Sequence, residues 1–110
     1  MKDKVLSLLS LAKKAGRIGS GETAVLDAVR GGDACLVLIA SDASEGTAKK
    51  FRDKTGYYEV PCMTYGTKES LGRAIGTDIR SVVAVKDRGL ADSIISRLEE
   101  ADINGKKEDQ

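Results

Sequence analysis

The most constraining feature of this sequence is Ala34–Ala40, a run of seven apolar residues in the first half of the chain. Both the odd and the even positions of the run are apolar, so a strand formed here needs other elements packed on both of its faces. Val82–Val85 repeats this pattern nearer the C-terminus. Two strands of this kind predict a sheet that lies between two layers of helices. The residues expected to be buried there are Leu36, Leu38, Val83 and Val85.

The segments between these strands have the apolar spacing and the capping residues of helices. In the first segment apolar residues recur at the i, i+3, i+4, i+7 spacing, and Ser20, Ser44, Thr67 and Asp87 stand where a side chain can cap a later helix. Glycines then end the helices. The expected helices span 3–15, 20–30, 44–55, 67–75 and 87–103, and the expected strands span 17–18, 34–40, 60–65 and 82–85.

This order of elements predicts an α/β fold, namely a three-layer α/β/α sandwich with a small mixed four-stranded sheet and helices on both faces. Pro61 cannot donate a ladder hydrogen bond, so the third strand is expected to begin there or to lie at the edge of the sheet. No linker or repeat divides the chain. Residues 1–110 are therefore expected to form a single domain, ordered over about 3–103, with a flexible C-terminal tail after Asn104–Gly105.

Composition excludes several classes of chemistry. The chain has no histidine and only two cysteines, Cys35 and Cys62, which excludes a Cys/His zinc site and argues against a disulfide framework. We expect no metal, no cofactor and no catalysis, with both thiols reduced in the core. The longest apolar run is far shorter than the roughly 20 residues of a membrane span, and the N-terminus lacks the apolar core of a signal peptide. A cytoplasmic protein without membrane contact is expected.

A glycine-rich turn at Gly19–Ala24 is the first segment that indicates binding chemistry. It matches the GxGxxG/A dinucleotide fingerprint, and Asp42 stands where an acid that binds ribose would follow. That fingerprint needs a full buried strand before it, whereas only Arg17–Ile18 separates this turn from the preceding helix. More generally, a helix that starts in such a turn presents free backbone amides to phosphate oxygens, including those of nucleic acid.

Cations are concentrated just before this turn. Lys13, Lys14 and Arg17 would extend it into a basic patch for a polyanion, and the alternative is a tight turn beside a solvated helix face. The helix expected over 44–55 carries a second group of cations, which form either a further phosphate contact or a solvated basic face. These residues are Lys49, Lys50, Arg52 and Lys54.

Several ordered motifs together resemble a known family. They resemble the ribosomal protein superfamily typified by archaeal L-seven-Ae, which includes L-thirty-e and S-twelve-e. The motifs are Gly21–Glu22 with the helix that ends at Gly31–Gly32, then Ala34–Ser44, and finally Thr67–Gly76 followed by Val82–Val85. The resemblance covers roughly residues 3–100. It is closest to the small bacterial YlxQ-like members, which share Asp42–Ser44 and Tyr57–Tyr58.

The resemblance implies an α/β/α sandwich that binds structured RNA, characteristically kink-turns, with ribosomal RNA among the candidates and no DNA. In this family the loop and first turns of the second helix meet the bent RNA strand, and another loop packs on a flipped-out base. Tyr65 would stack on that base, and the alternative is that its ring covers the core rim. The residues expected to contact RNA are Lys13, Lys14, Arg17, Gly19, Ser20, Gly21, Glu22, Thr23, Tyr65, Gly66 and Thr67.

The second helix departs from the family pattern of Asn, Glu and Lys. Alignment on Gly21 and Gly32 places Thr23, Ala24 and Asp27 at those three positions, and a shifted register that uses Glu22 places Val25 at the lysine position. Either alignment lacks the cation. Two other hypotheses stand beside RNA binding. One is a protein-interaction module on the same fold that has lost RNA recognition, and the other is a small nucleotide-binding enzyme.

Overall fold

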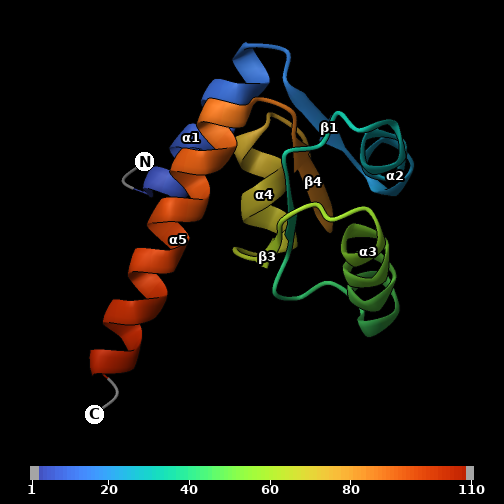
Figure 1. The fold of residues 1–110 in the computed structure, drawn as a ribbon. Coiled ribbons are helices and arrows are strands. Elements are labelled where there is room, and N and C mark those ends of the chain that lie inside the picture. Colours follow the sequence, from blue (N-terminus) through green and yellow to red (C-terminus); the bar gives the residue numbers. More distant parts are fainter. Residues whose placement is uncertain (1–2, 109–110) are drawn as a thin grey trace.

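The computed structural model describes residues 3–108 as a sheet with helices on both faces. Figure 1 shows α1, α4 and α5 on one side of the strands and α2 and α3 on the other. This arrangement confirms the expected three-layer α/β/α sandwich. The elements are α1 (Lys4–Lys14), β1 (Ile18–Ser20), α2 (Glu22–Gly31), β2 (Leu36–Ile39), α3 (Glu45–Tyr57), β3 (Cys62–Thr64), α4 (Lys68–Ala74), β4 (Val82–Val85) and α5 (Arg88–Glu108).

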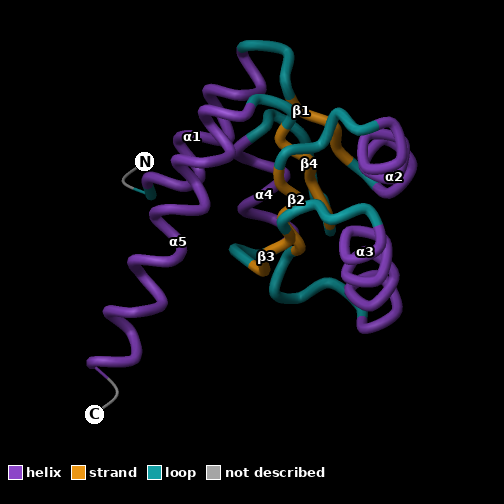
Figure 2. Tube along the Cα trace, in the orientation of Figure 1, coloured by secondary structure: helices purple, strands orange, loops and turns teal. Residues whose placement is uncertain are grey.

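The sheet is mixed, in the strand order β1-β4-β2-β3 (Figure 2). Strand β4 is antiparallel to both of its neighbours, and β2 is parallel to β3. Strands β1, β2 and β3 therefore all run in one direction. As a result, the C-terminal ends of these three strands lie at the same end of the sheet as the N-terminal end of β4.

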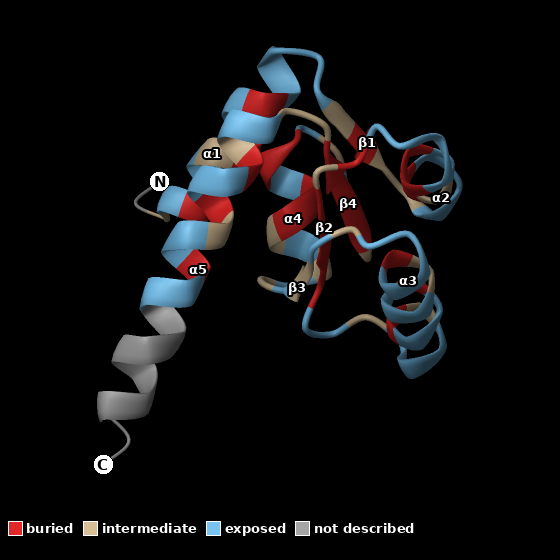
Figure 3. Cartoon of the chain, viewed as in Figure 1, coloured by how far each residue is buried: buried red, intermediate tan, exposed pale blue. Residues whose placement is uncertain are grey.

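Each face of the sheet packs against its own hydrophobic cluster. Leu36, Leu38, Val83 and Val85 pack with apolar residues of α1, α4 and α5, and all four side chains are 0% exposed, as predicted. The alternate residues of the same strands pack with α2 and α3. Figure 3 shows β2 and β4 as fully buried strands between the two layers. The double-sided apolar pattern of the sequence thus reflects burial on both faces.

Three of the four predicted caps are present. Ser44 Oγ accepts from the Thr47 amide at 3.1 Å, Thr67 Oγ1 from the Ser70 amide at 3.0 Å, and Asp87 Oδ2 from the Leu90 amide at 2.8 Å. Such contacts satisfy amides that have no partner within the helix. Helix α1 has a cap that the sequence analysis did not predict, because Asp3 Oδ1 accepts from the Leu6 amide at 2.9 Å.

The predicted Ser20 cap is wrong. Ser20 pairs with Val83 as the last residue of β1, and Gly21 is the N-cap of α2. Gly21 has φ +89°, a backbone conformation that residues with a side chain rarely adopt. This conformation reverses the chain direction between β1 and α2. Ser20 Oγ instead accepts a 3.2 Å hydrogen bond from Arg80 Nε.

Other boundaries differ by a few residues. Strand β1 is Ile18–Ser20 rather than 17–18, and β3 is shorter than 60–65, beginning directly after Pro61 at the edge of the sheet. Helix α5 continues past Asn104–Gly105 to Glu108, so this pair does not end it, consistent with the modest cost of about 1 kcal/mol for glycine within a helix. The prediction for the final tail at 109–110 lies outside the described residues.

Candidate nucleic-acid interface

Four loops meet at one end of the sheet because of the strand directions described above. We call this the loop end, and it consists of Ser20–Gly21 at the end of β1, Ser41–Ser44 after β2, Tyr65–Thr67 after β3, and Ile79–Ser81 before β4. Helices α2, α3 and α4 all begin there (Figure 1). A helix start carries free N–H groups and the positive end of the helix dipole, which favour anions. The structure thus brings the predicted glycine turn and the predicted Tyr65–Thr67 loop to the same end.

Hydrogen bonds between loops fix this end of the sheet. The Gly66 carbonyl accepts from both the amide and the hydroxyl of Ser41, at 2.8 and 2.7 Å. Asp42 Oδ1 accepts from the Lys68 amide at 2.8 Å, at the start of α4. The Asp42 carboxylate therefore anchors a neighbouring helix, which is a structural role in place of the ribose contact that the dinucleotide fingerprint requires.

The start of α2 is open among the described residues. No side chain there caps its amides, and Thr23 and Ala24 are exposed in its first turn. The Gly21 amide donates to the Val82 carbonyl at 3.2 Å, which holds the turn against β4. An uncapped helix start held on a rigid sheet suits a phosphate oxygen.

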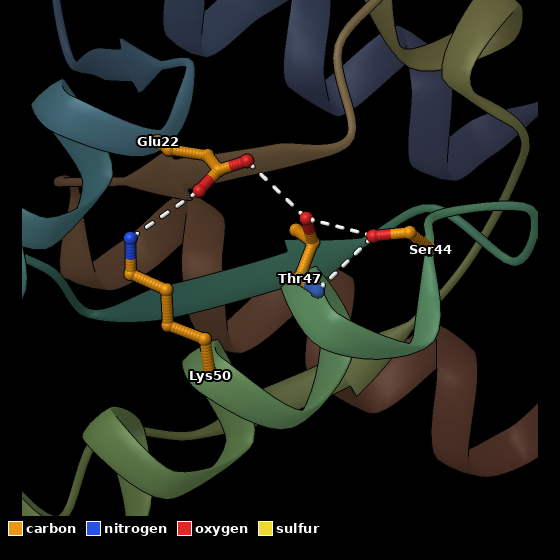
Figure 4. A network of polar contacts seen from close by, with 4 residues as sticks. All are labelled: Glu22, Ser44, Thr47 and Lys50. Carbon is orange, nitrogen blue, oxygen red and sulfur yellow. Dashed lines mark hydrogen bonds and ion pairs between the residues drawn. The ribbon is translucent and has the colours of Figure 1, made fainter.

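Glu22 lies at this helix start and is held by α3 (Figure 4). Its carboxylate accepts from Lys50 Nζ at 3.3 Å and from Thr47 Oγ1 at 3.2 Å, while Thr47 Oγ1 also accepts from Ser44 Oγ at 3.0 Å. The Glu22 side chain is still 47% exposed. This network ties the two helix starts together, and it places the Lys50 ammonium where it offsets the negative charge of Glu22.

A hollow of about 300 Å³ lies beside the start of α2. Ile79 is 55% exposed at this hollow, and Arg80 donates from its Nε to Ser20 and from its NH1 to the Ile79 carbonyl at 2.7 Å. An exposed aliphatic side chain next to an arginine offers contacts to a base and to a phosphate. The residues that line the hollow are Ser20, Gly21, Glu22, Ile79, Arg80, Ser81 and Val82.

Sequence reasoning missed Ile79 and Arg80. In the sequence, the one indication of their role is their position directly before a buried strand. That position places them beside the start of α2 only when the strand is known to pair with β1. A close approach to α4 holds their loop, because a Cβ on Gly72 would lie 2.1 Å from the Asp78 carbonyl oxygen. The Arg80 amide also donates to the Lys68 carbonyl at 3.0 Å.

The predicted basic patch lies elsewhere. Lys13 and Lys14 are in the last turn of α1, and Arg17 precedes β1, so all three are at the opposite end of the sheet from the loop end. The Arg17 guanidinium donates at 2.8 Å to the carbonyl of Lys86, which follows β4. At about 3.3 Å per residue, Arg17 is about 13 Å along the strand from Gly21. The structure does not bring these cations together with the glycine turn.

Two further predicted contacts have structural roles. Gly19 is buried in β1, where an added Cβ would lie 3.3 Å from Lys86 Cε, so this glycine serves close packing. Tyr65 packs against the α1/α4/α5 cluster, and its hydroxyl donates to the Asp3 carboxylate. Burial and the bond to Asp3 raise the pKa of Tyr65 to about 12. Its ring therefore lies at the core rim and is partly exposed.

The described side chains contain no group of three or more His, Cys, Asp or Glu residues that could hold a metal ion. Cys35 and Cys62 are both free thiols and partly buried, and burial raises the pKa of the Cys62 thiol. Within residues 3–108, none of the helices has the length and apolar character needed to cross a bilayer.

The sequence over residues 3–95 matches the model of the ribosomal protein L7Ae/L30e/S12e/Gadd45 family. The chain belongs to this family. Among its relatives, a protein of Bacillus subtilis strain 168 named RNA-binding protein YlxQ is 47% identical over 92 residues, which are 84% of this chain and 92% of the relative. The protein of the same name from Enterococcus faecium is 38% identical over 90 residues, covering 82% and 86% of the two chains.

Solved structures share the fold of this chain. A Bacillus halodurans protein of unknown function superposes with a TM-score of 0.82 at 43% identity, covering 84% of this chain and 94% of that one. The 15.5kD RNA binding protein of Giardia lamblia superposes with a TM-score of 0.77 at 24% identity, covering 91% and 92%, and this likeness concerns the fold alone.

Proposed function

We propose that this chain is a non-catalytic RNA-binding protein that holds a sharply bent, kink-turn-like RNA at the loop end of the sheet. Structured RNA of the cytoplasm, ribosomal RNA included, is the proposed partner. Membership of the L7Ae/L30e/S12e/Gadd45 family and the name of the YlxQ relatives support RNA binding.

The observation that carries the proposal is the juxtaposition at the hollow. The open start of α2 faces Ile79 and Arg80, and the Gly66–Thr67 loop lies at the same end of the sheet. Backbone amides and a guanidinium bind phosphate, while an exposed aliphatic side chain packs on a base that has left its stack. Bent RNA offers both groups close together, whereas a regular duplex keeps its bases stacked.

The proposed contact set therefore differs from the one predicted from sequence. It keeps Gly21, Glu22, Thr23, Gly66 and Thr67 and adds Ile79 and Arg80. It omits Lys13, Lys14 and Arg17, whose attraction to RNA at the loop end should be weak, because exposed charges separated by more than about 10 Å are largely screened at physiological salt.

Fluorescence anisotropy tests this proposal with a labelled kink-turn RNA and a straight duplex of the same composition. The kink-turn RNA should bind several-fold more tightly than the duplex. Arg80→Gln should weaken binding and lower the salt dependence by about one ion equivalent. Arg73→Gln is the matched control, because Arg73 is an exposed arginine of α4 that pairs with Glu69 at 3.3 Å. Equal affinity for both RNAs, or equal effects of the two arginine variants, would contradict the proposal.

One observation favours the alternative of a protein-interaction module. Asp27 is exposed on α2, four residues after Thr23 and hence on the same helix face, where its carboxylate repels phosphate. If neither RNA binds at low salt, the protein-interaction module becomes the better hypothesis.

A further inference from the structure

The far end of α3 carries an exposed aromatic pair that the proposed RNA site does not use. Tyr57 ends the helix and is 80% exposed, and Tyr58 follows it and is 40% exposed. The two ring centroids are 4.9 Å apart in an edge-to-face arrangement. Together these rings are two of the four aromatic side chains in the whole sequence, so their exposure leaves half of the aromatic residues available at one place on the surface.

The backbone holds both tyrosines in place. Directly after them, Glu59 has φ +57°, in the left-handed region, and its amide donates to the Gly56 carbonyl at 3.3 Å. The Val60 amide then donates to the Thr55 carbonyl at 2.8 Å, which turns the chain toward β3. This tight reversal is typical of a fixed helix end, so the ring pair is presented from a rigid support.

Cations border the aromatic pair. A hollow of about 440 Å³ is lined by Lys50, Asp53, Lys54, Tyr57 and Tyr58. The one carboxylate in this set, Asp53, pairs with Lys49 at 3.0 Å, so it does not neutralise Lys54. Lys50 pairs with Glu22 at 3.3 Å, so Lys54 is the lining cation for which the described residues provide no ion-pair partner. The hollow therefore combines two aromatic rings with one such lysine.

We propose that this surface, the tyrosine hollow, binds a single-stranded RNA segment by stacking bases on Tyr57 and Tyr58 while Lys54 contacts its phosphates. Aromatic platforms flanked by cations bind single strands with little regard to sequence, because every base has a face that stacks. A duplex is excluded, since its bases are already stacked on one another.

The lining residues favour this occupant over a protein. None of the five described residues around the hollow is aliphatic. Tyrosine is enriched at protein interfaces, but lysine and aspartate, the other three lining residues, are depleted there. A phosphate backbone complements Lys54, whereas an apolar protein patch would bury its charge. The tyrosine hollow also continues from the loop end, because Lys50 lines it and also reaches Glu22 at the start of α2.

The proposal does not rest on kink-turn binding, and a labelled single-stranded RNA decamer tests it directly. The decamer should bind the wild type, and Tyr57→Ala with Tyr58→Ala should weaken its binding by at least about fivefold for each stacked base lost. The double Phe variant keeps both rings and should bind as the wild type does. Lys54→Gln should lower the salt dependence by about 0.7, the value for one contact on a single strand.

Two parallel measurements separate the possible outcomes. The double Ala variant should bind a kink-turn RNA without overhangs as tightly as the wild type does, which shows that it is folded and that the loop end is independent. A decamer affinity that is absent, or unchanged by the double Ala substitution, overturns the proposal. So does light scattering that shows wild-type self-association abolished by the same substitution, since the rings would then form a protein contact.

Discussion

Two glycines shape the hollow beside α2. Gly21 supplies the positive φ that turns β1 into an uncapped helix start, and Gly72 lets the Asp78–Ile79 backbone approach α4 too closely for any side chain. Neither role involves a contact with a ligand. The exposed chemistry of Ile79 and Arg80 thus depends on the backbone geometry that these two glycines allow.

The first prediction concerns Gly72. Gly72→Ala places a Cβ 2.1 Å from a backbone oxygen, so the Asp78–Ile79 loop must move. Overpacking of this kind should lower the free energy of unfolding by about 1–3 kcal/mol in urea denaturation and should weaken RNA binding. Gly46→Ala is the control, because a Cβ there meets nothing within 4 Å, and it should not lower the stability. Wild-type stability for Gly72→Ala would refute the close approach.

The second prediction uses the exposed carboxylate of Asp27. Unit charges about 6 Å apart at an effective dielectric of 20 interact by about 3 kcal/mol, and solvent exposure and salt reduce this to about 1 kcal/mol or less. Asp27→Lys should therefore bind kink-turn RNA several-fold more tightly at low salt. Asp33→Lys makes the same charge change beyond the C-terminal end of α2 and should have a smaller effect. No gain for Asp27→Lys would mean that α2 does not face the RNA.

At the scale of elements, the sequence predicted each helix and strand but not their arrangement around the site. The caps at Ser44, Thr67 and Asp87 each depend on the residue three positions later, so local pattern was sufficient. The cap predicted at Ser20 was wrong because strand pairing with Val83, a partner far along the chain, extends β1 to this residue. The same long-range pairing brings Ile79–Arg80 to α2 and extends β1 between Arg17 and Gly21. The residues near these positions in the sequence do not indicate which strands will pair.

The third prediction concerns the link between α1 and the loop after β3. The Tyr65 hydroxyl donates to Asp3, the N-cap of α1, and burial together with this bond raises the pKa of Tyr65 to about 12. A pKa raised above the ordinary value of 10 means that the folded state holds the proton more tightly than the unfolded state does. The resulting stability should be fully present below pH 10 and should be lost as the pH rises through 12.

Two measurements check this link. Tyrosinate absorbance should show one group ionising near pH 12 that disappears in Tyr65→Phe and persists in Tyr57→Phe. The free energy of unfolding of Tyr65→Phe should be about 1 kcal/mol lower at neutral pH and should vary less between pH 10 and 12. A late ionisation that survives Tyr65→Phe would assign it to another group.

For the whole molecule, a nearly neutral formal charge of +1 conceals two separate groups of cations. Lys50 and Lys68 are in helices that begin at the loop end, and Arg80 is in the Ile79–Ser81 loop there. Lys13, Lys14 and Arg17 lie at the opposite end of the sheet. Proximity in sequence predicted that the second group would flank the glycine turn. The direction of β1 instead carries the chain away from these cations before the turn is reached.

The central claim, that RNA binds at the loop end, is tested most directly by the salt dependence of kink-turn RNA affinity in two triple variants. Each variant replaces three cations by glutamine, so the loss of net charge is the same. Replacement of Lys50, Lys68 and Arg80 should flatten the slope of log affinity against log salt by about two to three, while replacement of Lys13, Lys14 and Arg17 should change it by less than about one. The reverse ranking would place the RNA at the opposite end of the sheet and contradict the account.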